Sequence, residues 1–333
     1  MLPRSARAIG NVARAAAAAA VIFSAALSAA GTLDTDLIAR ARVFPSVGKG
    51  VTAIHRDHAG RYVVLTERGG VQIFDAKGQP AGHAPADPSP SAAIAYGADL
   101  DLDDQGRIYV ADQERNAIRV FSGDGRQERQ INIAGPTAVA TLAGGELAVA
   151  SLRSPKLVTV FGPEGQVVRE FGEPEQISGR QELNRYANIG RLCRDSAGRL
   201  YYSFTYLPEP TVRRYDRFGY SDFQLILNSD EYAASSMSAR KAIFREEEQG
   251  KPALHVVLGP VAVDPSSGEI WLAIAGRLLR FGPDGSERGS FLIFTPEELR
   301  IEASAILFEP GRILVASSQQ GVFDLPRPAA WSQ

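Results

Sequence analysis

Several residue types that would point to a particular chemistry are scarce in this chain. Cysteine occurs once, at Cys193, so no intramolecular disulfide can form. The sequence contains no His-x-x-x-His pair, no Gly-x-Ser-x-Gly motif and no phosphate-binding P-loop. A multi-histidine metal site is not indicated either, because the four histidines do not stand at ligand spacing: His55, His58, His83 and His255.

An excess of charge of one sign is also lacking. The formal net charge is −2, from 36 Lys and Arg against 38 Asp and Glu. A bulk attraction to nucleic acid or to an anionic membrane is therefore not expected. Cys193 falls on a predicted inner strand, and we interpret it as a small buried residue rather than a catalytic thiol.

The N-terminal stretch is the one long apolar run. Arg4, Arg7 and Arg14 precede it, and it runs from Ala15 to Ala30. This pattern predicts a signal peptide over residues 1–30 with cleavage before Gly31, and hence a periplasmic or secreted protein with no transmembrane span in the mature chain. A mitochondrial transit peptide and a retained membrane anchor are the alternatives.

A repeated pair of turns runs through the rest of the chain. Residues 97–125 show the pattern, with a strand, a tight turn at Gly106, two further strands and a second turn at Gly125. The two turn glycines stay 17 to 21 residues apart in five units: Gly60 to Gly78, Gly106 to Gly125, Gly145 to Gly165, Gly198 to Gly219 and Gly268 to Gly285. With a sixth first turn at Gly311, this spacing predicts an all-β fold, a six-bladed β-propeller of four-stranded antiparallel blades.

Residues 97–125 resemble an NHL repeat, and residues 259–264 resemble the opening strand of that repeat. The resemblance extends over roughly residues 50–325 and implies a propeller of the NHL-like superfamily. It implies less about function, because the family contains binding scaffolds, lyases and lactonase-like enzymes. We expect residues 31–333 to form a single domain.

The segments outside the repeat complete the prediction. The last unit offers three strands, so we assign residues 37–44 as the outer strand of the last blade, which closes the ring and covers a sheet edge. Residues 80–90 are rich in proline and are expected to be an irregular loop, and residues 172–186 a longer linker. Residues 228–253 contain good helix formers and predict a helical insertion between blades four and five.

The long segments all fall on one face of the predicted propeller. This long-loop face carries the loops between second and third strands and the links between blades, whereas the other face carries only tight glycine turns. Binding is therefore expected on the long-loop face around the mouth of the central channel. Its candidate residues are Asp99, Asp101, Arg115, Arg153, Arg185, Tyr186, Asn188, Arg191, Tyr206, Lys241 and Arg245.

Arginine is frequent among these candidates. One interpretation is an anionic ligand held by guanidinium groups, and the other is ordinary solvated loop charge. The predicted helix is expected to cover or flank the channel mouth beside Arg185 and Arg191. Lys241 and Arg245 are four residues apart and would share one helix face there.

Polar residues on the inner strands form a second group. Alignment on the first turn places His55 and Asp101 on neighbouring blades, and we expect them to approach each other, as a structural pair in preference to an acid/base or metal pair. Asp57, Asp103, Asp195 and Asp264 precede the turns and are expected to bond turn amides. Asp112 at a strand end is also interpreted as structural.

The leading hypothesis is a binding or scaffold protein, not an enzyme, that recognises a protein, peptide or glycan on the long-loop face, without nucleic acid and without a cofactor. The alternative is a metal-dependent hydrolase or lyase at the channel mouth. The family resemblance implies for gluconolactonase-like relatives a calcium site of Glu, Asn and Asp, for which Asn188 and Asp99 are candidates here. The matching glutamate is absent, because residues 51–54 read Val-Thr-Ala-Ile.

Overall fold

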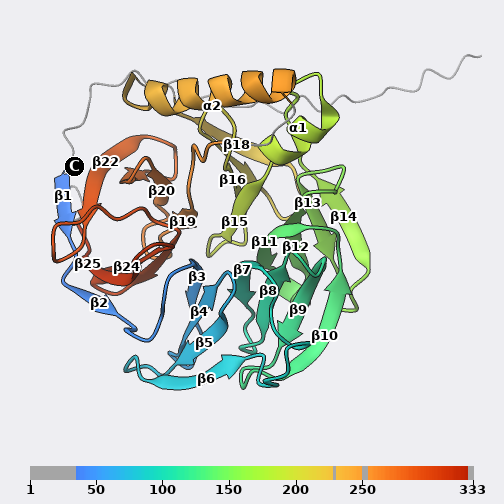
Figure 1. Cartoon of the computed structure of the whole chain (residues 1–333), viewed down its shortest axis with the longest axis vertical. Helices are drawn as coiled ribbons and strands as arrows, with labels where there is room; N and C mark the ends of the chain where they lie inside the picture. The colour runs from blue at the N-terminus through green and yellow to red at the C-terminus, as the bar shows by residue number, and fades with distance from the viewer. Residues whose placement is uncertain (1–34, 228–229, 250–253, 329–333) are drawn as a thin grey trace, which may run out of the picture.

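Six β-sheets stand in a ring in the computed structural model, which describes residues 35–227, 230–249 and 254–328 (Figure 1). Each sheet contains four consecutive antiparallel strands or their equivalent, with the first strand of each blade facing the centre. The predicted six-bladed β-propeller is thereby confirmed.

The first four blades follow the chain without interruption. Blade one is β3(Val51–Arg56), β4(Tyr62–Thr66), β5(Gly70–Phe74) and β6(Pro80–Ala84); blade two is β7(Gly97–Leu102), β8(Ile108–Asp112), β9(Ala117–Phe121) and β10(Gln127–Asn132). Blade three is β11(Pro136–Thr141), β12(Leu147–Ser151), β13(Val158–Phe161) and β14(Val167–Phe171), and blade four is β15(Gly190–Arg194), β16(Leu200–Phe204), β17(Thr211–Tyr215) and β18(Ser221–Ile226).

The last two blades each take a strand from the N-terminal segment. Blade five is β19(Val261–Val263), β20(Ile270–Ile274), β21(Arg277–Phe281) and β22(Glu287–Phe294), with β1(Thr35–Ile38) added in parallel to β22. Blade six is β23(Ala305–Glu309), β24(Arg312–Ser317) and β25(Gly321–Pro326), completed by β2(Ala41–Val43).

The closing strand is therefore confirmed only in its second half. Residues 41–43 do form the outer strand of the last blade, but residues 35–38 belong to blade five. The chain changes sheets between them, because the Ala39 amide donates to Phe294 O at 2.8 Å and the Arg40 amide to Asp324 O at 2.7 Å. One segment thus satisfies the exposed edges of two sheets.

Two connecting segments contain regular structure that the sequence did not predict. Residues 80–84 form the outer strand β6, although Pro80 begins it; a proline is tolerated at the first residue of an edge strand, where no ladder partner is needed. The linker at 172–186 contains helix α1(Gln181–Ala187), which buries Leu183 and Ala187. A short 3-10 helix, η1(Ala143–Gly145), forms the first turn of blade three.

The predicted insertion between blades four and five is confirmed as α2(Asp230–Gln249). Tyr232 packs into the core between those blades. Figure 1 shows α2 at the rim of the ring, outside β18 and next to α1, and not across the centre. The helix therefore does not cover the channel mouth; it contacts α1, and its Arg240 pairs with Glu209 in the loop between β16 and β17.

The apolar core lies between neighbouring blades. Six clusters of buried side chains each join two adjacent sheets; Leu65 and Val110, for example, belong to the cluster between blades one and two. The closing segment takes part, since Phe44 packs on Tyr62 and Phe74 with ring centroids 5.1 and 4.6 Å apart. Because every blade needs both neighbours to bury its faces, the closing strand supports the whole ring.

The aspartates before the first turns are structural, as expected. Asp103 accepts hydrogen bonds from the amides of Gln105 and Arg107 at 3.0 and 2.9 Å, and Asp57, Asp195 and Asp264 bond turn amides in the same way. The turn glycines have positive φ, for example 75° at Gly106, which favours glycine. These turns fix where each inner strand ends.

Within the described residues, no helix has the length and apolar character needed to cross a membrane. The predicted signal peptide at residues 1–30 lies outside the described residues.

Candidate ligand site in the central channel

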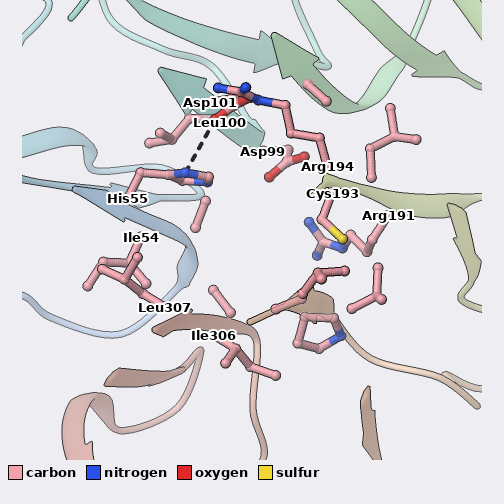
Figure 2. Close-up of a pocket in the computed structure, with 18 of the residues that line it drawn as sticks. Ile54, His55, Asp99, Leu100, Asp101, Arg191, Cys193, Arg194, Ile306 and Leu307 are labelled. Atoms are coloured by element: carbon pink, nitrogen blue, oxygen red, sulfur yellow. Dashed lines mark ion pairs between the residues drawn. The ribbon is translucent and has the colours of Figure 1, made fainter. Parts of the chain in front are cut away.

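The inner strands of the six blades enclose a cavity of about 380 Å³ at the centre of the ring, which we call the channel (Figure 2). Blades five and six contribute a mainly apolar wall that includes Ala262 and Ile306. Blades one, two and four contribute the charged side chains of the wall: His55, Asp99, Asp101, Arg191, Arg194 and Asp195. The channel thus has one polar side and one apolar side.

Strand direction divides the polar side into two levels. β7 begins after the link from blade one, on the long-loop face, and ends at the turn that contains Gly106. Side chains alternate along a strand, so Asp99 and Asp101 both face the channel. Asp99 therefore lies toward the long-loop face and Asp101 toward the tight-turn face.

Asp99 is a buried carboxyl, with an exposed fraction of 8%. Its Oδ2 accepts a hydrogen bond from the Val139 amide of blade three at 3.0 Å. Burial raises the pKa of Asp99 to about 7, with Asp101 acting in the same direction and Arg191 and the Val139 amide opposing the shift. Asp99 can consequently hold or release a proton near neutral pH.

Arg191 extends from blade four to blade two. Its Nη1 donates to the carbonyl oxygen of Ala98 at 2.8 Å, and in the described residues this is its one side-chain hydrogen bond. It passes blade three, whose contribution to the channel wall is limited to Val139 and Ala140. Figure 2 shows Asp99 and Arg191 both directed into the channel. A guanidinium with unused donors therefore lies beside a carboxyl that titrates near pH 7.

The expected approach of His55 and Asp101 is observed. His55 Nδ1 lies 3.3 Å from Asp101 Oδ1, as the dashed line in Figure 2 marks. Asp101 also accepts hydrogen bonds from the Thr141 amide at 2.7 Å, from the Thr141 hydroxyl at 2.9 Å and from the Leu102 amide at 2.8 Å. These bonds tie blades one, two and three together, which supports the structural interpretation of the pair.

Cys193 lies on the inner strand β15, as predicted, and its half-buried side chain lines the channel. Burial, together with the carboxylates of Asp195, Asp101 and Asp99, raises the pKa of the Cys193 thiol far above its usual range. The thiol form is the unreactive one, so this position does not fit a nucleophile.

Tyr206 belongs to a group near Arg191 that also includes Tyr96 and Glu67. Burial and the Glu67 carboxylate raise the pKa of the Tyr96 phenol, with Arg191 acting in the opposite direction and Tyr206 in the same one. The guanidinium of Arg68 lies 5.5 Å from the centre of the Tyr96 ring. Sequence reasoning missed Tyr96, because the link between blades carries no repeat mark.

Asn188 serves the linker rather than the channel. Its side-chain oxygen accepts from the Glu175 amide at 2.8 Å, and its side-chain nitrogen donates to Glu175 O and Asn184 O, both at 2.8 Å. The structure therefore does not bring Asn188 and Asp99 into one site. Among the described residues, no group of three or more His, Cys, Asp or Glu side chains is arranged to hold a metal ion.

The remaining candidates lie away from the channel. Arg115 donates to Ala93 O at 3.0 Å and lies 3.6 Å from Asp112, which itself accepts from the Ala95 and Tyr96 amides. Arg153, Arg185, Lys241 and Arg245 are exposed and Tyr186 is partly exposed. None of these lines the channel, and their contact with a larger partner stays a prediction.

No family model and no curated protein matches the sequence. Solved structures of similar fold include a streptogramin B lyase at 13% identity, with a TM-score of 0.55 over 84% of this chain and 94% of that one. A virginiamycin B lyase from Staphylococcus aureus is 12% identical, with a TM-score of 0.53 over 86% and 98%. The extracellular domain of a B. thetaiotaomicron protein is 10% identical, with a TM-score of 0.51 over 91% of this chain and 43% of that one. At these identities the likeness is one of fold, so the chain belongs with the β-propellers, and the finer NHL assignment stays a prediction.

Proposed function

We propose that this protein is an exported binding propeller that takes a small ligand, or the end of a peptide or glycan, into the long-loop end of its channel. The observation that carries the proposal is the convergence of Asp99 and Arg191 in a cavity with an apolar opposite wall. Buried ionisable groups destabilise a fold unless they are fully paired, so an incompletely paired set in a cavity marks a candidate binding site.

The size and lining of the channel support a ligand of modest dimensions. Its volume of about 380 Å³ lies within the range of small-molecule pockets. The apolar wall of blades five and six would accept a hydrocarbon part, and the polar side a charged or hydrogen-bonding head. Larger protein or glycan partners would have to insert one residue or sugar from the long-loop face.

A thermal-shift panel of small acids, amines and neutral compounds tests this proposal. Ala262→Phe fills the apolar wall of the channel, and Ala234→Phe makes the same exchange at an exposed position of α2. We expect at least one compound to raise the melting temperature of the parent and of Ala234→Phe but not of Ala262→Phe. Equal stabilisation of all three, or no stabilised parent, would contradict channel binding. Arg191→Gln replaces Ala262→Phe if the latter does not unfold cooperatively.

Export is the second part of the proposal and rests on the apolar run that precedes Gly31. The chain expressed from Met1 should be recovered from an exported fraction with a mature N-terminus near Gly31, as N-terminal sequencing or intact mass would show. Retention of Met1 on a membrane-bound form would support the anchor instead.

A hydrolase or lyase with its site in the channel is the second candidate. It is favoured by Asp99, because a carboxyl whose pKa is near 7 suits general acid or base catalysis at neutral pH. Metal analysis of the purified full chain separates the two candidates. A stoichiometric calcium or zinc ion would favour the enzyme and count against a function in binding alone.

A further inference from the structure

The polar and the apolar residues of the channel wall come from different blades. Asp99 belongs to blade two and Arg191 to blade four, and both lie on the side that includes blade three. Ala262 and Ile306 come from blades five and six, across the channel. A ligand that satisfies both sides must carry a polar head and an apolar body.

The charges on the polar side decide the sign of that head. Asp101 accepts three hydrogen bonds from Thr141 and Leu102 and pairs with His55, so it has little capacity left for a ligand. Arg191, in contrast, uses one of its five N–H donors, on the Ala98 carbonyl. The unused hydrogen-bonding capacity on this side is therefore mainly cationic, and it favours an acceptor that carries negative charge.

We propose that the channel binds a small organic carboxylate, with the carboxylate on the Arg191 guanidinium and the apolar body against blades five and six. This inference rests on the proposed binding function and narrows its ligand to one class. A monocarboxylate suits the site, because Arg191 stands at the beginning of β15 on the same level as Asp99, whereas Arg194 stands at the end of that strand on the level of Asp101.

Asp99 gives this inference a pH dependence. The protonated Asp99 carboxyl can lie next to a bound carboxylate and donate a hydrogen bond to it, whereas the ionised form would repel it. Affinity for a carboxylate should therefore fall as pH rises through the pKa of Asp99, which lies near 7. The other titratable or charged groups that line the channel with Asp99 are Arg191, Asp101, His55, Cys193, Arg194 and Asp195.

Three probes with one aromatic body and different heads test the inference by calorimetry on the full chain at pH 6: phenylacetate, phenethylamine and 2-phenylethanol. We expect phenylacetate to bind most tightly. Arg191→Gln should weaken its binding about tenfold or more, as expected for the loss of a charge-assisted hydrogen bond, and Arg191→Lys should recover part of the loss. The matched control Arg153→Gln, at an exposed loop position, should bind like the parent.

Measuring phenylacetate affinity as a function of pH tests the contribution of Asp99. Phenylacetate remains ionised between pH 6 and pH 8, and over this range its affinity for the parent should fall by about tenfold if one carboxyl with a pKa near 7 controls it. Asp99→Asn should abolish most of this dependence, which separates Asp99 from the His55 imidazole. A dependence that persists in Asp99→Asn would contradict the part assigned to Asp99.

The outcomes also distinguish this inference from the proposed function. Preference for phenethylamine or 2-phenylethanol, blocked by Ala262→Phe, would overturn the carboxylate inference and leave channel binding in place. Phenylacetate binding that survives both Arg191→Gln and Ala262→Phe would overturn both. Failure of all three probes to bind would overturn the inference, and the compound panel would then decide the proposed function.

Discussion

His55 Nδ1 and Asp101 Oδ1 lie 3.3 Å apart and join the inner strands of blades one and two. The two residues differ in their other hydrogen bonds, because Asp101 also accepts from the Thr141 amide and hydroxyl of blade three. Asp101→Ala should therefore lower the free energy of unfolding by roughly 2–4 kcal/mol, since it leaves buried donors without their acceptor.

His55→Ala is the matched comparison. The His55 side chain is 38% exposed, and its loss should cost no more than about 1 kcal/mol. Urea denaturation of both variants measures the difference. If His55→Ala were as damaging as Asp101→Ala, the pair would not be the structural tie described above.

β1 offers a second pair of neighbouring residues. Leu37 is buried in the core between blades five and six, whereas the next residue, Ile38, is 50% exposed. Leu37→Ala should cost roughly 2–3 kcal/mol in unfolding free energy and Ile38→Ala less than about 1 kcal/mol. Similar costs for both substitutions would indicate that β1 does not pack on blade five.

Deletion of residues 35–44, which removes β1 and β2 together, should abolish the cooperative unfolding transition of the propeller.

Asp99 predicts how stability depends on pH. Its pKa is raised from 3.8 to about 7 on folding, so the stability that its protonated form provides is complete below pH 4 and is lost as pH rises through 7. Relative to the parent, Asp99→Asn should gain as much as roughly 4 kcal/mol between pH 4 and pH 8, because each pKa unit corresponds to about 1.4 kcal/mol. The exposed control Asp36→Asn should show no such trend in denaturation measured across this range.

The exposed pair on α2 provides a negative prediction for the channel. The Arg245 guanidinium donates to the Lys241 carbonyl at 3.5 Å, and Figure 1 shows α2 at the rim. Replacing both residues with alanine should change the unfolding free energy by less than about 0.5 kcal/mol and leave phenylacetate affinity unchanged. Weaker phenylacetate binding would bring α2 into the site. Weaker binding of a larger partner, greatest at low salt, would agree with the prediction from sequence.

The ring of six blades could be predicted from the sequence because each blade is marked by short turn motifs that can be recognised locally. In four of the six blades an aspartate, two or three residues and a glycine mark the first turn, and a turn of this kind fixes the end of one strand and the start of the next. The approach of His55 and Asp101 followed from the same alignment, since equivalent positions on adjacent inner strands must be neighbours.

Features that depend on distant segments could not be predicted. The bond from Arg191 to Ala98 crosses blade three and links residues 93 apart, so no local pattern signals it. β1 adds in parallel to β22, where Thr35 pairs with Phe291, 256 residues later, and this register depends on where the ring closes. Helix α1 is seven residues long. It is stabilised by burial of Leu183 and Ala187, and its N-cap residue Arg180 makes no side-chain capping hydrogen bond that a sequence motif could reveal.

We propose that the channel, and not the outer surface, is the binding site. The most direct test is an anomalous difference map from crystals soaked with a brominated form of the compound that the panel finds to bind most tightly. We expect a bromine peak inside the channel, between the side that carries Asp99 and Arg191 and the opposite wall with Ile306. A bromine peak on the rim beside α2 or against the exposed loops, with the channel empty, would contradict it.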